Sequence, residues 1–390
     1  MGNHATASEM TGGFCLRAVL GLALCILAAA LAGCGSLARL PAVPLAQAQN
    51  SNVLDIPNAR FYGENRQHID AIALNVHQRR VKAGTVSRPV RFLVISGGGD
   101  DGAFGAGLLV GWSERGDRPQ FDVVTGVSTG ALSAPFAFLG RDYDAALKRI
   151  YSESNSGEIF QSRAIIGALA SDSVLDSAPL RHMIDGYVDA VLVERIAAAY
   201  RAGRLLLILT TNLDQGRPVI WNIGAVADSG HPKARELIVD ILLASASIPA
   251  IFPPVMIDAT IDGQTYQEMH VDGGTVAQAF MYPASFSLKR FASRLPGVDT
   301  TLAARPVVYI IRNGRFSRTE ASIERQTFAI AKQALATMTA SSGVNDTYRM
   351  YLIAQRDGVA YNLTSIDDDF AVPYKGPFDQ DYMRALFDYG

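Results

Sequence analysis

The chain contains few cysteines and no excess of charge of either sign. Its 390 residues include three cysteines, of which Cys15 and Cys25 lie in an N-terminal stretch that we expect to be removed. Cys34 would then have no second thiol to pair with, which excludes a disulfide framework. Lys and Arg number 35 against 37 Asp and Glu, and no basic run occurs. We therefore expect no nucleic-acid partner.

The N-terminal stretch lacks an apolar run long enough to span a bilayer. Residues 18–31 are continuously apolar and follow a single basic residue, Arg17. A membrane-spanning helix needs about 20 apolar residues, whereas a shorter run followed by small residues is typical of a signal peptide. We predict that residues 1–33 are such a signal, and a start at Met10 would leave a tidier one.

The four residues 31–34, Leu-Ala-Gly-Cys, resemble the lipobox of bacterial lipoproteins. The resemblance implies that Cys34 is acylated and becomes the new N-terminus, so that its acyl chains anchor the protein in a membrane. No aspartate follows Cys34 directly, and in Gram-negative lipoproteins this favours the outer membrane, facing the periplasm. The alternative is an ordinary signal peptide that happens to contain a cysteine.

Beyond the signal, the sequence has no internal repeat and no low-complexity segment. Residues 34–88 are expected to be a tether, rich in Ala, Pro, Gln and Leu up to about residue 51, followed by a lead-in with an early helix. Residues 89–390 are long enough for one large domain with a C-terminal extension.

Short apolar strands alternate with helices along this domain. Such alternation predicts an α/β fold around a mostly parallel sheet. Asp262-Gly263 suits a tight hairpin turn between two further strands. The expected strands are 90–95, 121–125, 205–210, 255–261, 265–271 and 307–311, and the expected helices are 103–112, 129–139 and 234–244.

A glycine-flanked serine lies between the second strand and the second helix. Gly126, Ser128 and Gly130 form a G-x-S-x-G pattern at this point. Glycines permit a cramped turn that exposes the serine hydroxyl, with a helix N-terminus behind it. We therefore predict that Ser128 is a nucleophile.

A second glycine-rich turn follows the first strand. Gly97, Gly99 and Gly102 fit G-x-G-x-x-G, the fingerprint of dinucleotide-binding turns, but that reading needs an acidic residue at the end of the next strand, and Asp122 opens it instead. The favoured interpretation is an oxyanion hole, in which backbone N–H groups of residues 97–99 face a developing negative oxygen.

The serine needs a base, and few histidines are available for that role. No histidine follows His270, so an α/β-hydrolase triad would need His270 with an earlier acid such as Asp258. A carboxylate acting directly is the alternative. Asp272 ends a predicted strand, Gly273 and Gly274 turn the chain after it, and burial would raise its pKa towards a useful value.

Together these three blocks, with the serine-proline stretch at residues 244–249, resemble the patatin-like phospholipases over residues 90–282. The resemblance implies a three-layer α/β/α sandwich and a dyad in which Ser128 attacks an ester and Asp272 accepts its proton. It implies backbone amides of Gly97, Gly98 and Gly99 as the oxyanion hole. Asp101 departs from the family, which commonly has a basic residue there. Asp100 and Asp101 could instead interact with the N-terminus of the next helix, where negative charge is favourable.

The expected function is hydrolysis of carboxylic esters in membrane lipids, without metal or cofactor. The rival interpretation is a non-catalytic lipoprotein that binds lipid or protein on a hydrolase scaffold, and Asp101 is the feature that favours it. An NAD-linked enzyme is the third alternative. The apolar segments 164–169 and 248–252 are candidates for an acyl pocket or for core.

Overall fold

The structure is a computed structural model that describes residues 38–153, 176–295, 305–317, 320, 322–377 and 379–390. The chain divides into two units, Met1–Leu40 and Pro41–Gly390. The predicted signal, Cys34 and segment 164–169 lie outside the described residues. Among the helices of the described residues, none is long and apolar enough to cross a membrane.

The second unit is built on one mixed sheet. Its strands are β1 Arg60–Phe61, β2 Arg91–Ile95, β3 Val123–Gly126, β4 Leu205–Asn212, β5 Arg217–Asn222, β6 Val255–Ile261, β7 Gln264–Asp272, β8 Val307–Arg312 and β9 Ala360–Ser365. The order is β1-β5-β4-β3-β2-β8-β9, and the β6–β7 hairpin joins β4 through β7. The neighbouring strands β4, β3, β2, β8 and β9 run parallel. Strands β1, β5, β6 and β7 add antiparallel pairs.

Helices cover both faces of this sheet. The α-helices are α2 Arg66–Lys82, α3 Gly102–Arg115, α4 Thr129–Leu139, α5 Asp144–Lys148, α8 Ala178–Tyr187, α9 Ala190–Arg201, α10 Ile223–Ala227, α11 Ala234–Ser245, α12 Leu288–Ala292, α13 Thr327–Asp357 and α14 Gln380–Tyr389. Short turns of other helix types are η1 Leu45–Asn50, η2 Gly99–Asp101, η3 Arg141–Tyr143, η4 Arg149–Glu153 and η5 Gly273–Thr275.

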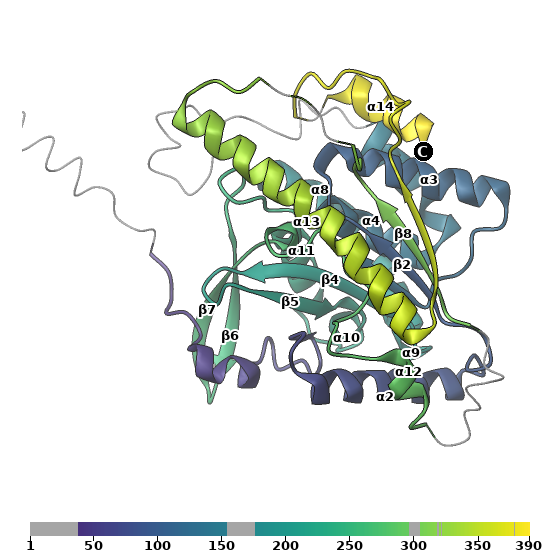
Figure 1. Cartoon of the computed structure of the whole chain (residues 1–390). Coiled ribbons are helices and arrows are strands. Elements are labelled where there is room, and N and C mark those ends of the chain that lie inside the picture. The colour runs from purple at the N-terminus through teal and green to yellow at the C-terminus, as the bar shows by residue number, and fades with distance from the viewer. Residues whose placement is uncertain (1–37, 154–175, 296–304, 318–319, 321, 378) are drawn as a thin grey trace, which may run out of the picture. The chain divides into compact units, whose positions relative to one another are not determined.

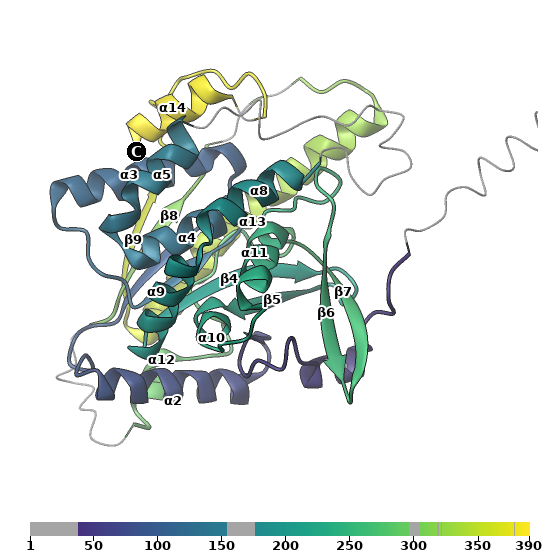
Figure 2. The same ribbon diagram turned by 180° about the vertical axis from the view of Figure 1, so that it is seen from behind.

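Two hydrophobic cores show how these layers are held together. Successive side chains of a strand point to opposite faces, so Leu93 and Ile95 of β2 pack with α3, α4, α9 and α11, whereas Phe92 and Val94 pack with α2 and α13. Figure 1 is seen from the α13 side of the sheet and Figure 2 from the side of α4, α9 and α11. The predicted three-layer α/β/α sandwich is therefore confirmed.

The predicted strands and helices all exist, with small shifts at their ends. The hairpin turn forms as expected, because Asp262 and Gly263 both take the left-handed conformation, with φ of 49° and 81°. The antiparallel strands β1 and β5, the edge strand β9 and the long helix α13 were not predicted.

The expected tether is shorter than the sequence suggested. Val43, Ala48 and Val53 are buried in the core, and Asn52 forms an isolated bridge with Thr260 of β6. The compact unit accordingly begins at Pro41 rather than near residue 51. These apolar residues are widely spaced, so their burial was not visible in the sequence pattern.

The register of β4 brings β3 and β7 to the same place. Residues 205–208 of β4 pair with β3, and residues 210–212 pair with β7. Since β5 occupies the other edge of β4, β7 continues along the edge where β3 ends. Asp272, opposite Thr210, therefore lies beside the turn that follows Gly126.

Candidate active site

Ser128 occupies the turn between β3 and α4 and has an unusual backbone. Its φ of 55° and ψ of −127° fall in a region that costs a non-glycine residue about 1–3 kcal/mol. The backbone around this turn is closely packed. A Cβ on Gly126 would lie 2.5 Å from the Gly130 carbonyl oxygen, and one on Gly130 would lie 2.3 Å from the Ile95 carbonyl oxygen. Only glycine fits at both predicted motif positions.

The serine-rich end of α11 supports both motif residues. The Ser128 N–H donates to Ser245 Oγ at 3.1 Å, and that hydroxyl donates to the Leu209 carbonyl at 2.7 Å. The N–H of Asp272 donates to the Ser247 carbonyl at 2.9 Å. Residues 244–249 were noticed in the sequence as a block, but these contacts depend on tertiary structure and were not predicted.

Asp272 lies at the end of β7 in contact with Ser128. Its side chain is 4% exposed, the Gly274 N–H donates to its Oδ1 at 2.6 Å, and the Ser128 hydroxyl is a further hydrogen-bond partner. Burial raises the pKa of Asp272 to about 7, against the opposing effect of these two hydrogen bonds. The carboxylate is thus poised to exchange a proton near neutral pH.

The glycines after Asp272 let the chain turn tightly. A Cβ on Gly273 would lie 2.5 Å from the Leu209 carbonyl oxygen, and one on Gly274 would lie 2.3 Å from Gln278 Nε2 and 2.9 Å from Asp272 Oδ1. Larger residues would therefore push the Asp272 carboxylate away from Ser128.

The glycine turn after β2 lies against Ser128, but its three amides differ. The Gly97 N–H donates to the Gln278 carbonyl at 2.9 Å, so it is not free to bind an oxyanion as the sequence suggested. Among the described residues, no acceptor contacts the N–H groups of Gly98 and Gly99. Gly99 has a φ of 57° and open space beside it. These two amides are the remaining candidate oxyanion donors, and the turn formed by residues 97–99 is called the oxyanion turn below.

Packing explains the remaining glycines of this turn. A Cβ on Gly97 would lie 3.2 Å from Ser128 Cβ, and one on Gly98 would lie 2.1 Å from the Asn313 carbonyl oxygen. At Gly102, a Cβ would lie 2.1 Å from Thr129 Oγ1, so this residue brings α3 against the start of α4. The oxyanion turn and the serine turn are thereby packed together.

The acidic pair in this turn contacts the C-terminal segment. Asp101 Oδ1 accepts a hydrogen bond from Tyr382 at 2.7 Å, and Asp100 Oδ2 accepts one from Tyr374 at 3.1 Å. Asp101 is the N-cap residue of α3, so its charge lies at the helix N-terminus as the sequence suggested, but its side chain makes no capping hydrogen bond. Burial raises the pKa of Asp101 to about 6, and the tyrosine hydroxyl opposes this shift. Asp101, which departs from the family's usual basic residue, thus has a tyrosine as its hydrogen-bond partner.

The histidine alternative is not assembled in the structure. His270 is fully buried, with Nδ1 2.9 Å from Thr210 Oγ1 and Nε2 3.1 Å from Glu268. Asp258 is exposed and pairs with Gln267 across the hairpin. Both ring nitrogens of His270 are therefore occupied by groups other than Ser128 and Asp258.

The dinucleotide alternative also lacks its acidic residue. Asp122 precedes β3, at the end of the strand opposite the serine turn, where it pairs with Arg80 and accepts the Arg91 N–H at 2.9 Å. Its role is structural. In the described part of the chain, no group of three or more His, Cys, Asp or Glu side chains could hold a metal ion.

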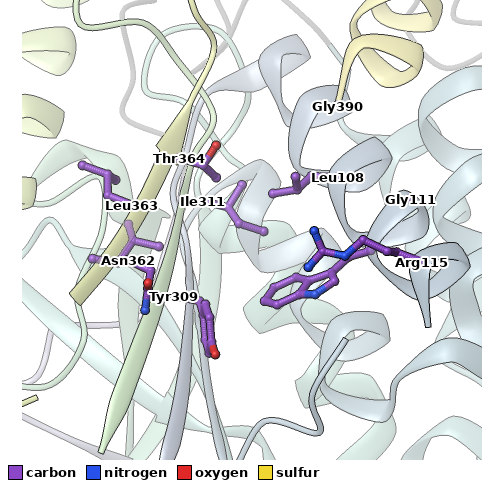
Figure 3. Close-up of a pocket in the computed structure, with 11 residues that line it drawn as sticks. Leu108, Gly111, Arg115, Tyr309, Ile311, Asn362, Leu363, Thr364 and Gly390 are labelled. Carbon is purple, nitrogen blue, oxygen red and sulfur yellow. The ribbon is translucent and has the colours of Figure 1, made fainter. Parts of the chain in front are cut away.

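A pocket of about 370 Å³ lies elsewhere, between α3 and the strands β8 and β9. Figure 3 shows Leu108, Tyr309, Ile311 and Leu363 around it. None of its lining residues belongs to the predicted motifs. Ile248 and Ile251, candidates for an acyl pocket, are instead partly exposed after α11, at 36% and 38%.

A comparison with known proteins matches the part of the chain that contains these motifs. Residues 93–285 match the family model of the patatin-like phospholipases. Similar solved structures are VipD from Legionella pneumophila (13% identity, TM-score 0.34, 77% of this chain and 66% of that one) and human GIVD cytosolic phospholipase A2 (11% identity, TM-score 0.31, 74% and 51%). The chain thus spans less than two thirds of either protein. No curated protein sequence matches.

The matched residues contain both glycine turns, Ser128 and Asp272, and they include the strands and helices that position them. Residues 93–285 are therefore a patatin-like phospholipase domain.

Proposed function

We propose that the protein hydrolyses carboxylic esters of lipids, as a serine esterase of the phospholipase A type. The observation that carries this proposal is the contact between the Ser128 hydroxyl and the buried Asp272 carboxylate. A carboxylate with a raised pKa is a suitable base for a serine that has no histidine beside it.

The proposed reaction has two steps that share one proton acceptor. In the first, Ser128 Oγ attacks the ester carbonyl carbon while Asp272 takes its proton, and the N–H groups of Gly98 and Gly99 hold the oxyanion. The intermediate then expels the alcohol, which takes the proton from Asp272, and an acyl-serine remains. In the second step, water attacks the acyl carbon as Asp272 accepts a proton. The fatty acid leaves and the proton returns to Ser128.

A fluorophosphonate probe tests this proposal directly. The chain without residues 1–34 should be labelled and should hydrolyse p-nitrophenyl butyrate, and Ser128→Ala should abolish both. Ser229→Ala is a matched control, because its hydroxyl donates to the Val226 carbonyl and accepts from the His231 N–H, both remote in sequence from every motif. Absence of label and turnover from the folded protein would overturn the proposal and leave the non-catalytic lipoprotein.

We further propose that acylated Cys34 anchors the protein in the bacterial outer membrane, facing the periplasm. The lipobox-like residues 31–34 support this. Cells fed an alkyne-tagged palmitate should label the wild-type protein but not Cys34→Ser. A mature N-terminus other than residue 34, measured by mass spectrometry, would contradict the anchor without affecting the proposed chemistry.

A further inference from the structure

Arg312, the last residue of β8, is a buried cation without a direct ion pair. It is 6% exposed. The other buried arginines are compensated: Arg60 pairs with Glu268, Arg80 pairs with Asp122, and Arg204 donates to two backbone carbonyls. Among the described residues, no carboxylate lies within ion-pair distance of Arg312.

The Arg312 guanidinium also uses few of its hydrogen-bond donors. Its Nη2 donates to the Arg315 carbonyl at 3.1 Å, and its carbon lies 4.9 Å from the Phe316 ring centre. Its Nε is buried with no partner in the described part of the chain. An uncompensated buried charge is expensive, and such groups occur where a ligand supplies the opposite charge.

Arg312 flanks the oxyanion turn. Strand β8 pairs with β2 up to Ile311, and the Asn313 N–H then donates to Ser96 Oγ at 2.8 Å. The Asn313 carbonyl fills the space where a Cβ of Gly98 would lie, at 2.1 Å. The residue before Asn313 therefore lies beside the turn whose amides face the reacting carbonyl.

Helix α13 leaves space for this guanidinium. Gly343 lies within α13, where glycine costs about 1 kcal/mol relative to alanine. A Cβ at this position would lie 2.4 Å from Arg312 Nη1 and 3.3 Å from the guanidinium carbon. The glycine is therefore explained by the close approach of Arg312.

The two carboxylates that act on Arg312 from a distance are committed to other groups. Both Asp101 and Asp346 favour its charged form electrostatically. Asp101 accepts from Tyr382, whereas Asp346 accepts the N–H groups of Gln278 at 2.6 Å and Ala279 at 3.1 Å and pairs with Arg349. Neither carboxylate supplies a direct partner for Arg312.

We propose that Arg312 binds the phosphate of a phospholipid substrate at the flank of the oxyanion turn. This rests on the proposed function and adds its selectivity. A planar guanidinium donates to phosphate oxygens in matched pairs, whereas an uncharged ester offers it no anion. The protein should therefore prefer phospholipids to neutral esters of the same acyl chain, although both use Ser128.

A substrate with a phosphate and one without it distinguish phosphate binding by Arg312 from a general effect on catalysis. Arg312→Gln should lower kcat/KM for phosphatidylcholine in mixed micelles by about 10- to 100-fold, the range for one charge-assisted hydrogen bond. Hydrolysis of p-nitrophenyl butyrate should stay within about 2-fold of wild type. Lys332→Gln on α13 is the matched control: it removes one exposed positive charge and should change neither rate.

The outcomes test the phosphate role of Arg312 separately from the proposed hydrolysis by Ser128. If Arg312→Gln loses activity equally on both substrates, or on neither, the phosphate role is overturned. Loss of all activity in Ser128→Ala would still support the proposed function. If Arg312→Gln fails to fold, Gly343→Ala displaces the guanidinium while keeping the arginine, and should show the same selective loss. Inhibition of the wild type by inorganic phosphate would indicate a site for free phosphate as well; selective loss without it assigns the site to the lipid headgroup.

Discussion

Replacing Asp272 by asparagine should separate catalysis from stability. Asparagine has the same shape, and its Oδ1 can still accept the Gly274 N–H, so the turn should remain folded. It cannot accept a proton from Ser128. Ester turnover should therefore fall by about 100-fold or more, the contribution of a positioned general base.

The same substitution should stabilise the protein at high pH. Burial raises the pKa of Asp272 from 3.8 to about 7, so the folded state holds a proton that the unfolded state has released between these values. Stability then falls as pH rises through this window, and ionised Asp272 costs about 4 kcal/mol above it. Asparagine escapes this cost, so its advantage over wild type should grow by about 2–3 kcal/mol from pH 5 to pH 8.

Urea unfolding at the two pH values measures this difference. Asp258→Asn, on the exposed side of β6, controls for the loss of one negative charge. Wild-type kcat/KM should in turn rise with pH to a plateau above about 7, since only ionised Asp272 accepts the proton. A stability difference that is the same at pH 5 and pH 8, or undiminished turnover in the asparagine variant, would refute the assignment of Asp272 as a buried base.

Three further substitutions test the surroundings of the dyad. Gly98→Ala should cost about 100-fold or more in kcat, measured with p-nitrophenyl butyrate, because its Cβ meets the Asn313 carbonyl and displaces an oxyanion donor; activity within 3-fold of wild type would contradict this. Ser245→Ala leaves the Ser128 N–H without its partner and should cost about 1–3 kcal/mol in urea unfolding, with a fall in kcat rather than a rise in KM. Glu268→Gln should cost about 3–5 kcal/mol, because Arg60 loses its buried partner; a loss below 1 kcal/mol would show that Ser51 and water compensate.

The sequence predicted the parts of the site that depend on local chain geometry. Gly126 and Gly130 are needed because a strand must turn at once into a helix, and the same constraint marks Gly273 and Gly274. Such constraints leave glycines at fixed offsets from the reactive residue. Ser128, Asp272 and the oxyanion turn could therefore be named before any contact was known.

What the sequence did not predict depends on contacts between distant segments. Tyr382 reaches Asp101 from 281 residues away, and the Gln278 carbonyl that accepts the Gly97 N–H lies in the loop after η5. Neither pairing leaves a local pattern. Strand β1 has only two residues, too few for a hydrophobic period, and the exposed first half of α13 has no polar face to mark it.

Strand β4 carries neither member of the dyad, yet it determines the distance between them. Gly126 is paired with Ile208 and Asp272 with Thr210, so two positions of a third strand measure the separation. One residue inserted at Leu209 would lengthen the stretch of β4 between Ile208 and Thr210 by about 3.3 Å. It would also turn either the β3 or the β7 pairing to the opposite face of the sheet. Length changes within β4 should therefore be tolerated far less than length changes in the turns at its two ends.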